Sequence, residues 1–152
     1  MQITTTLNLA VADYKDAQHW YWRLTDADGQ FLADQEVNLN PSDAEYEGFL
    51  DLPSYLAKHA VLYRRQEDEA RLVRQLGEWM GRSFYGPIGD KILDAGTPAI
   101  VRVLVPKEAA GLLYRPWELG YVQGQPLALQ DVTLISSRSR LSHERDLAEL
   151  RS

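Results

Sequence analysis

Histidine is the first residue type to consider, because a neutral imidazole binds metals and transfers protons near pH 7. The chain has three, His19, His59 and His143, and they fall on three separate predicted elements. None forms a His-x-His or His-x-x-x-His pair, and none has a carboxylate at the spacing of a metal site. We therefore expect no metal and no cofactor, and interpret the histidines as surface or capping residues.

Nucleophiles are equally scarce. The 152 residues include no cysteine, which excludes disulfides, thiolate metal sites and a cysteine nucleophile from them. Serines are present, but none lies in a Gly-x-Ser-x-Gly elbow. We expect no catalytic residue in this chain.

Two stretches resemble ligand-binding loops only in part. Asp26-x-Asp28-Gly29 begins like a calcium loop, but Val37 stands where the closing glutamate would be. We interpret it as a hairpin turn, since Asp and Gly tolerate positive φ. Residues 85–90 contain two glycines that could approach a phosphate, but no Gly-Lys-Ser/Thr follows, so we interpret them as a helix-ending turn.

One segment of the C-terminal third is the candidate interaction or structural motif: Arg115, Pro116, Trp117, Glu118 and Leu119. Glu118 lies between two apolar residues, where a carboxylate needs a partner. Arg102 and Arg115 are the candidate partners, and either would form a structural ion pair. A catalytic role for Glu118 would require a second polar group that the sequence does not identify.

The N-terminal third is predicted to form antiparallel strands. Residues 3–11 are rich in β-branched and apolar side chains, and residues 19–24 alternate, with Trp20 and Trp22 on one face and Tyr21 on the other. A strand near residues 31–39 would complete a hairpin. The three aromatic residues could form a stacking platform for bases or sugars. Core packing is the interpretation we favour.

Helical patterns follow. The strongest covers residues 65–82, and another begins near residues 52–54. Gly77-x-x-x-Gly81 in the first of these helices indicates close helix packing in water, not a membrane dimer. Its apolar face consists of Leu72, Val73, Leu76, Trp79 and Met80.

Two further strands, residues 99–105 and 131–136, are predicted to be buried and to flank a helix at residues 107–114. The first is apolar except for Arg102, which is the pattern of a central strand covered on both faces. The predicted fold class is α+β, with strands and helices packed as one sheet and its helices. We expect a single domain over residues 1–137 and a charged linker or frayed stub over residues 138–152.

Charge and hydropathy exclude several classes of function. Residues 1–51 carry ten acidic and two basic side chains, a formal charge of −8, whereas the whole chain has −6. Nucleic-acid binding needs a clustered basic surface, so we expect no nucleic-acid partner. No apolar run reaches the roughly 20 residues that span a bilayer, and no signal peptide is evident. We expect no membrane association and a cytoplasmic location.

The C-terminal third resembles the N-terminal segment of CHAT domains, which are caspase-like, separase-related peptidases of bacteria and eukaryotes. The likeness covers about residues 99–138 and follows the order strand, helix, Pro-Trp-Glu-Leu, a Leu-Ala-Leu stretch and strand. A second likeness, at residues 22–33, is to the N-terminal extension of some bacterial members. The residues that carry the first are 103–106, 112–119, 126–129 and 132–136.

The resemblance implies a His and Cys catalytic dyad downstream of this segment. The chain has no cysteine and no histidine in a matching motif, so no catalytic residue carries over. We therefore expect a non-catalytic accessory or regulatory domain whose partner is the downstream protease core, with the motif at residues 116–119 as a docking segment. The alternative is a stand-alone protein-binding module whose acidic N-terminal sheet recognises a basic surface.

Overall fold

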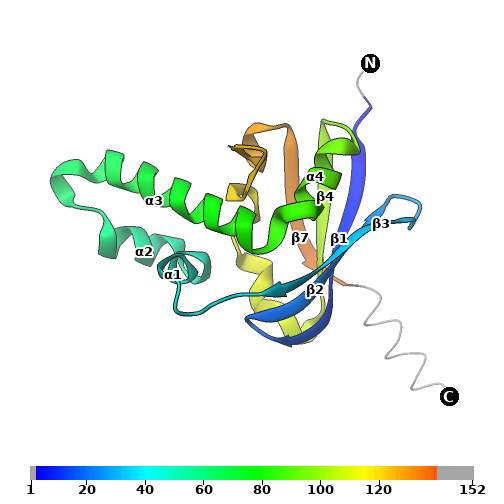
Figure 1. Cartoon of the computed structure of the whole chain (residues 1–152), viewed down its shortest axis with the longest axis horizontal. Coiled ribbons are helices and arrows are strands. Elements are labelled where there is room, and N and C mark those ends of the chain that lie inside the picture. The colour runs from blue at the N-terminus through cyan, green and yellow to red at the C-terminus, as the bar shows by residue number, and fades with distance from the viewer. Residues whose placement is uncertain (1–2, 140–152) are drawn as a thin grey trace.

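The computed structural model describes residues 3–139, which form a five-stranded sheet with its helices on one side (Figure 1). The strand order is β3-β2-β1-β4-β7. A separate two-stranded ribbon pairs β5 (Tyr121–Val122) with β6 (Gln125–Pro126). The strands of the large sheet are β1 (Thr5–Asp16), β2 (His19–Asp26), β3 (Phe31–Asn38), β4 (Ala99–Val105) and β7 (Val132–Arg138).

The sheet is mixed. Strands β1, β2 and β3 pair antiparallel, whereas β4 lies parallel to β1 and β7 lies parallel to β4. The α+β class and the antiparallel N-terminal third are thus confirmed. The turn between β2 and β3 is also as predicted, because the Asp26 carboxylate accepts the N–H groups of Asp28 and Gln30, both at 2.9 Å, and Gly29 has a φ of +83°.

Within residues 3–139, four α-helices and several 3₁₀ turns connect the strands. Helices α1, α2 and the start of α3 extend away from the sheet (Figure 1). Among residues 3–139, no helix has both the length and the apolar character that a bilayer span requires. The helices are α1 (Ala44–Leu50), α2 (Leu52–His59), α3 (Arg65–Met80) and α4 (Gly86–Asp94), and the 3₁₀ turns are Leu62–Arg64, Lys107–Tyr114, Trp117–Leu119 and Leu127–Leu129.

The end of α3 departs from the prediction. A π turn over Gly81–Tyr85 follows α3, and α4 then begins at Gly86, where a helix-ending turn was expected. Pro87 fits the first turn of α4, because the N–H that proline lacks has no intrahelical partner there. The glycine and proline that indicated an end therefore start a new helix. The predicted helix at residues 107–114 consists of 3₁₀ turns.

Burial is confined to the helix-facing side of the sheet. In β4, Val101 and Val103 are buried, but Ile100 and Leu104 are only partly buried and Arg102 is exposed, so the prediction of a strand covered on both faces is wrong for the described residues. In the sheet formed by residues 3–139, β7 is an edge strand, not a buried one, and Ile135 is 50% exposed. Arg102, the polar residue of β4, lies on the side that stays open.

Asp68 fastens the start of α3 to the turn before it. Its carboxylate is buried, accepts the Val61 N–H at 2.9 Å and lies 3.8 Å from the Arg64 guanidinium and 3.6 Å from that of Arg71. The Val61 hydrogen bond, followed by the two arginines, holds the pKa of Asp68 below its ordinary value of 3.8. The ionised form is therefore favoured by folding.

This contact predicts that the stability of the turn before α3 falls at acid pH. Because the folded pKa is depressed, the stabilisation is complete above the ordinary pKa of 3.8 and is lost as pH falls below it and through the folded pKa. Asp68→Asn should lower the unfolding temperature at pH 7 and reduce its fall on acidification. Thermal unfolding followed by circular dichroism at several pH values measures both. Glu78→Gln, at an exposed position of α3, is the control and should leave the profile unchanged.

Candidate interaction surface

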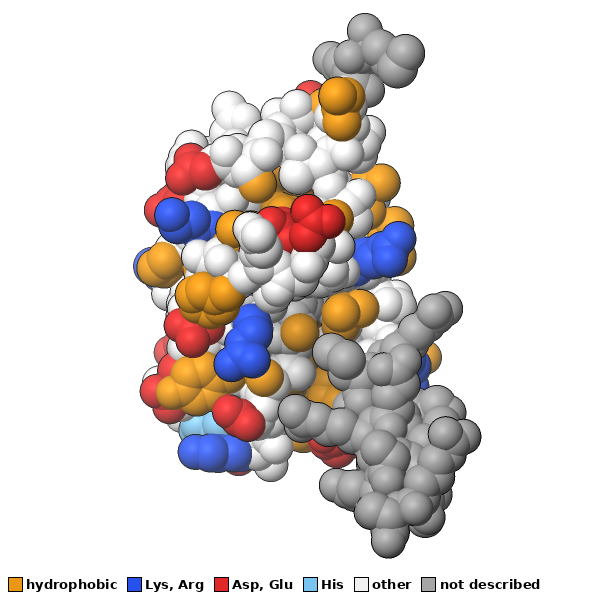
Figure 2. All heavy atoms as spheres, turned by 90° about the vertical axis from the view of Figure 1, so that its right-hand side faces the viewer, with side chains coloured by type: hydrophobic (Ala, Val, Ile, Leu, Met, Phe, Trp, Pro, Cys, Tyr) orange, Lys and Arg blue, Asp and Glu red, His pale blue; other side chains and the backbone are white. Residues whose placement is uncertain are grey.

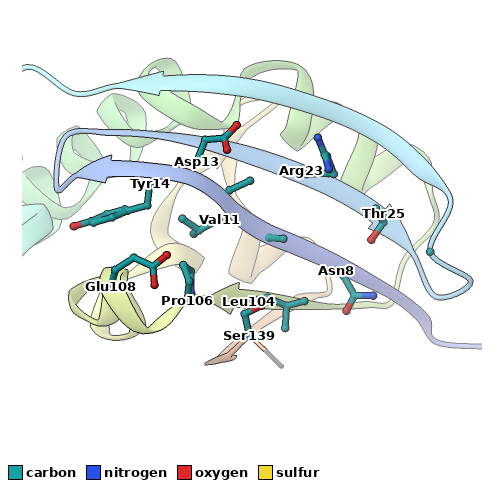
Figure 3. A pocket seen from close by; sticks show the side chains of 13 residues that line it. Asn8, Val11, Asp13, Tyr14, Arg23, Thr25, Leu104, Pro106, Glu108 and Ser139 are labelled. Carbon is teal, nitrogen blue, oxygen red and sulfur yellow. The ribbon is translucent and has the colours of Figure 1, made fainter. Parts of the chain in front are cut away.

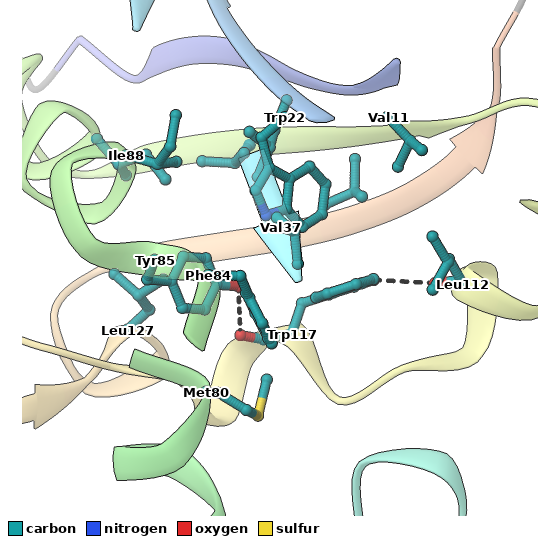
Figure 4. Packing of buried hydrophobic residues seen from close by; sticks show 14 of the residues in the cluster. Val11, Trp22, Val37, Met80, Phe84, Tyr85, Ile88, Leu112, Trp117 and Leu127 are labelled. Carbon is teal, nitrogen blue, oxygen red and sulfur yellow. Dashed lines mark hydrogen bonds between the residues drawn. The ribbon is translucent and has the colours of Figure 1, made fainter. Parts of the chain in front are cut away.

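Trp117 lies in the core. Its side chain is 2% exposed, its indole N–H donates to the Leu112 carbonyl at 3.1 Å, and its own carbonyl accepts the Tyr85 hydroxyl at 2.7 Å (Figure 4). Burial raises the pKa of Tyr85 well above its ordinary value, so this hydroxyl stays a neutral donor. The ring centroids of Trp22, Phe84 and Phe49 lie 5.1, 5.5 and 5.6 Å from that of Trp117.

Arg115 ties the motif to α1. Its Nη1 donates to the carbonyl of Leu50 at 3.0 Å, and its guanidinium carbon lies 5.5 Å from the centre of the Phe49 ring. Burial lowers the pKa of Arg115 from its ordinary value. The arginine therefore holds the C-terminal end of α1 against the segment that leads into Trp117. Its role in the motif is to position the backbone.

Glu118 does not form the predicted ion pair. It is exposed, and within residues 3–139 it pairs with neither Arg102, which lies on the open side of β4, nor Arg115. Tryptophan and leucine flank it in the sequence, but the 3₁₀ turn over Trp117–Leu119 directs successive side chains to different sides. Pro116 and Leu119 are partly buried.

We accordingly expect Glu118→Gln to change the free energy of unfolding by no more than about 0.5 kcal/mol, the usual range for an exposed position. Urea unfolding followed by circular dichroism gives the value. A loss of about 3 kcal/mol or more, the cost of breaking a buried ion pair, would contradict the exposed position.

Gly77 of α3 and Gly81, the first residue of the π turn after it, permit a close approach, as their spacing predicted. A Cβ on Gly77 would overlap the carbonyl oxygen of Leu119, and one on Gly81 would overlap that of Tyr121. The partner is not another helix, however. The glycines pack against the chain between Trp117 and Tyr121. This contact fixes the motif against the helix layer.

The histidines lie apart, and no cluster of potential metal ligands occurs among the described residues. His19 lies 2.7 Å from the Asp16 carboxylate at an exposed turn, and that neighbour contributes, after the Gln18 N–H, to a lowered pKa of Asp16. His59 lies 3.6 Å from Glu47, and its ring packs on Tyr55. His143 falls outside the described residues.

The aromatic residues of β2 pack as core. Trp20 and Trp22 are buried and meet edge to face at 5.8 Å, whereas Tyr21 points to the other side and is 37% exposed. The core interpretation is confirmed for both tryptophans, and a stacking platform made of all three rings is excluded, because neighbouring residues of a strand face opposite sides.

The other side of the sheet is open. None of the helices formed by residues 3–139 covers it, and Figure 2 shows apolar side chains there among basic and acidic ones. Alternation along each strand and the register between strands define this open face. Its members are Asn8, Ala10 and Ala12 of β1, Tyr21, Arg23 and Thr25 of β2, Asp34 and Glu36 of β3, Ile100, Arg102 and Leu104 of β4, and Thr133, Ile135 and Ser137 of β7.

A groove of ≈ 530 Å³ runs over β1 on this open face. Ala10 and Ala12, small outward residues of β1, form its floor, and longer side chains from the neighbouring elements line its sides. Asn8, Arg23 and Thr25 stand towards one end, whereas Asp13, Tyr14 and Glu108 stand towards the other, with Leu104, Pro106 and Ser139 along the β4 side.

The sequence did not single out these groove residues. The one available signal was the pair of alanines at alternate positions of β1, opposite long side chains on its neighbours. A scan of the chain against protein-family models, curated proteins and solved structures matches nothing. The open face is therefore interpreted from its own geometry.

Proposed function

We propose that this chain is the non-catalytic N-terminal accessory and regulatory domain of a CHAT-type, caspase-like protease of the cytoplasm, and that it docks on the protease core of the same protein. Two things support the proposal. One is the sequence resemblance over residues 99–138. The other, which carries it, is the half-covered sheet.

Parallel strands normally lie in sheets with both faces covered. Here β1, β4 and β7 run parallel, yet the outward positions carry Ile100, Leu104 and Ile135, of which Ile135 is half exposed. The outer edge of β7 also has no partner strand among residues 3–139. A bare apolar face beside a free edge fits one part of a larger α/β assembly. The docking surface we propose is the β4 and β7 side of this face, since Trp117 is too deeply buried for the Pro-Trp-Glu-Leu motif to dock by its tryptophan.

The absence of cysteine limits the role that this chain can have in a cysteine peptidase. A cysteine peptidase needs a thiolate and a base, and this chain supplies no thiol. Peptide hydrolysis would therefore belong to the core, and this domain would position or regulate it. Peptidase activity of this chain alone would contradict the assignment.

The direct test is the gene sequence beyond the codon for Ser152. A reading frame that continues into a strand ending in histidine, followed later by one ending in cysteine, would support the proposal. In such a protein, Ile135→Arg should weaken the contact between this domain and the core, measured by limited proteolysis of the junction. Glu78→Arg, on the helix side, should not. A stop codon directly after Ser152 would overturn the proposal.

The second candidate is a stand-alone module that binds a basic protein surface. The observation in its favour is the set of exposed carboxylates on the N-terminal strands. Asp13 and Glu36 line one shallow hollow together with Lys15 and His19, and Asp34 is exposed nearby on β3. Salt-sensitive capture of a basic partner that Glu36→Gln and Asp34→Asn weaken, and that Glu118→Gln leaves unchanged, would favour this function.

A further inference from the structure

The groove over β1 differs from an ordinary solvated sheet face. Its floor is Ala10 and Ala12, and Leu104 beside them is only partly exposed, so water in the groove contacts mainly apolar atoms there. The polar groups stand at the ends. Arg23 occupies one end and Asp13 with Glu108 the other, and none of the three forms an ion pair with another described residue (Figure 3). Such a site suits a short amphipathic segment with charges of both signs.

The described chain runs into this groove. Ser139 lines it, and the Ser139 N–H donates to the Val105 carbonyl at 2.9 Å, one residue beyond the last paired position of β7. The backbone is thus held at the groove at Ser139. Ser139 lines this groove together with Leu104 and Pro106.

We propose that residues 140–152 occupy the groove of their own chain. They are thirteen residues, and the floor between Asn8 and Ala12 is about 13 Å long at the rise of a strand, so the segment has ample reach. It carries three leucines for the alanine floor and an equal number of acidic and basic groups for the two charged ends. These are Leu141, Leu147 and Leu150, then Arg140, Arg145 and Arg151, then Glu144, Asp146 and Glu149.

The proposal goes beyond the proposed function and does not depend on it, because the occupant belongs to the chain itself. It also leaves Ile135 and the edge of β7, which lie outside the groove, free for another partner. The competing occupants are a second copy of the chain and a different protein. One experiment separates them.

The test uses the full chain with Ser152→Cys, whose thiol is unique because the chain has no cysteine. A nitroxide on this thiol broadens the amide signals of residues near it in a ¹⁵N-labelled sample. We expect the amides of Asn8, Ala10 and Arg23 to lose most of their intensity, and those of exposed α3 residues to keep theirs. Mixing spin-labelled unenriched protein with unlabelled ¹⁵N protein shows whether the broadening arises between molecules.

Two matched variants complete the design. Ala10→Arg places a long charged side chain on the groove floor and should restore the lost intensities. Thr133→Arg adds the same side chain on the same face outside the groove and should not. Both positions have access to solvent, so both variants are expected to fold. The spectrum of each variant without the nitroxide checks this. Broadening that spreads evenly over the surface, that stays near Ser139, or that appears only in the mixed sample would overturn the proposal.

Discussion

Replacing Trp117 by alanine is expected to lower the free energy of unfolding by about 3–5 kcal/mol, the cost of deleting a large buried aromatic side chain. Three neighbouring rings, those of Trp22, Phe49 and Phe84, lose their shared partner. The carbonyl of Leu112 loses its donor as well. Because domains of this size are stable by only about 5–15 kcal/mol, a loss of this size is a large part of the free energy of unfolding. Urea unfolding followed by circular dichroism measures the change.

Trp117→Phe is the matched control. It keeps a ring in the cluster but removes the indole N–H, so it should cost less, about 1–3 kcal/mol for the unpaired carbonyl of Leu112. The expected order of stability is wild type, then Phe, then Ala. A Trp117→Ala variant as stable as Glu118→Gln would contradict the buried position of this tryptophan.

The parts of the fold that depend on local pattern could be predicted from the sequence. Trp20, Trp22 and Leu24 alternate with polar residues, and a period of two places them on the same face whatever surrounds the strand. The Asp26 turn was equally predictable, because its carboxylate bonds to nearby backbone N–H groups. In both cases the partners are close in sequence.

Burial of β4 could not be predicted in this way. Ile100 and Leu104 are apolar, so the strand resembles one covered on both faces, yet no element formed by residues 3–139 packs on the open side. Which face is covered depends on helices distant in the sequence. The same outward apolar residues are what a face meeting a partner would carry, which is the reason that they support the proposed docking.

The motif at residues 115–119 shows the same limit. The residue types of this motif indicated either a docking segment or an ion pair. In the structure, Trp117 is buried among rings from β2, α1 and the π turn. The neighbours of Glu118 in sequence are therefore not its neighbours in space. Sequence spacing alone identified one long-range feature, the close approach at Gly77 and Gly81, because only glycine lets a backbone lie against a helix.

That approach gives the second large prediction. Gly77→Ala adds a helix-favouring residue inside α3, a gain of about 1 kcal/mol in an isolated helix. The new Cβ would overlap the carbonyl oxygen of Leu119, and a backbone atom cannot swing aside as a side-chain end can. Overpacking costs about 1–3 kcal/mol and sometimes more, and the rigid partner puts this site at the upper end. We expect a net loss of about 2 kcal/mol.

The sign of this effect separates propensity from packing. Gln75→Ala, at an exposed position of the same helix, changes propensity without adding a contact and should alter stability by no more than about 0.5 kcal/mol. Urea unfolding of both variants supplies the comparison. If Gly77→Ala were more stable than wild type, α3 would have to lie farther from Leu119. The close packing of the Trp117 segment on this helix would then be wrong. A loss confined to Gly77→Ala would show that packing, not helix propensity, selects glycine here.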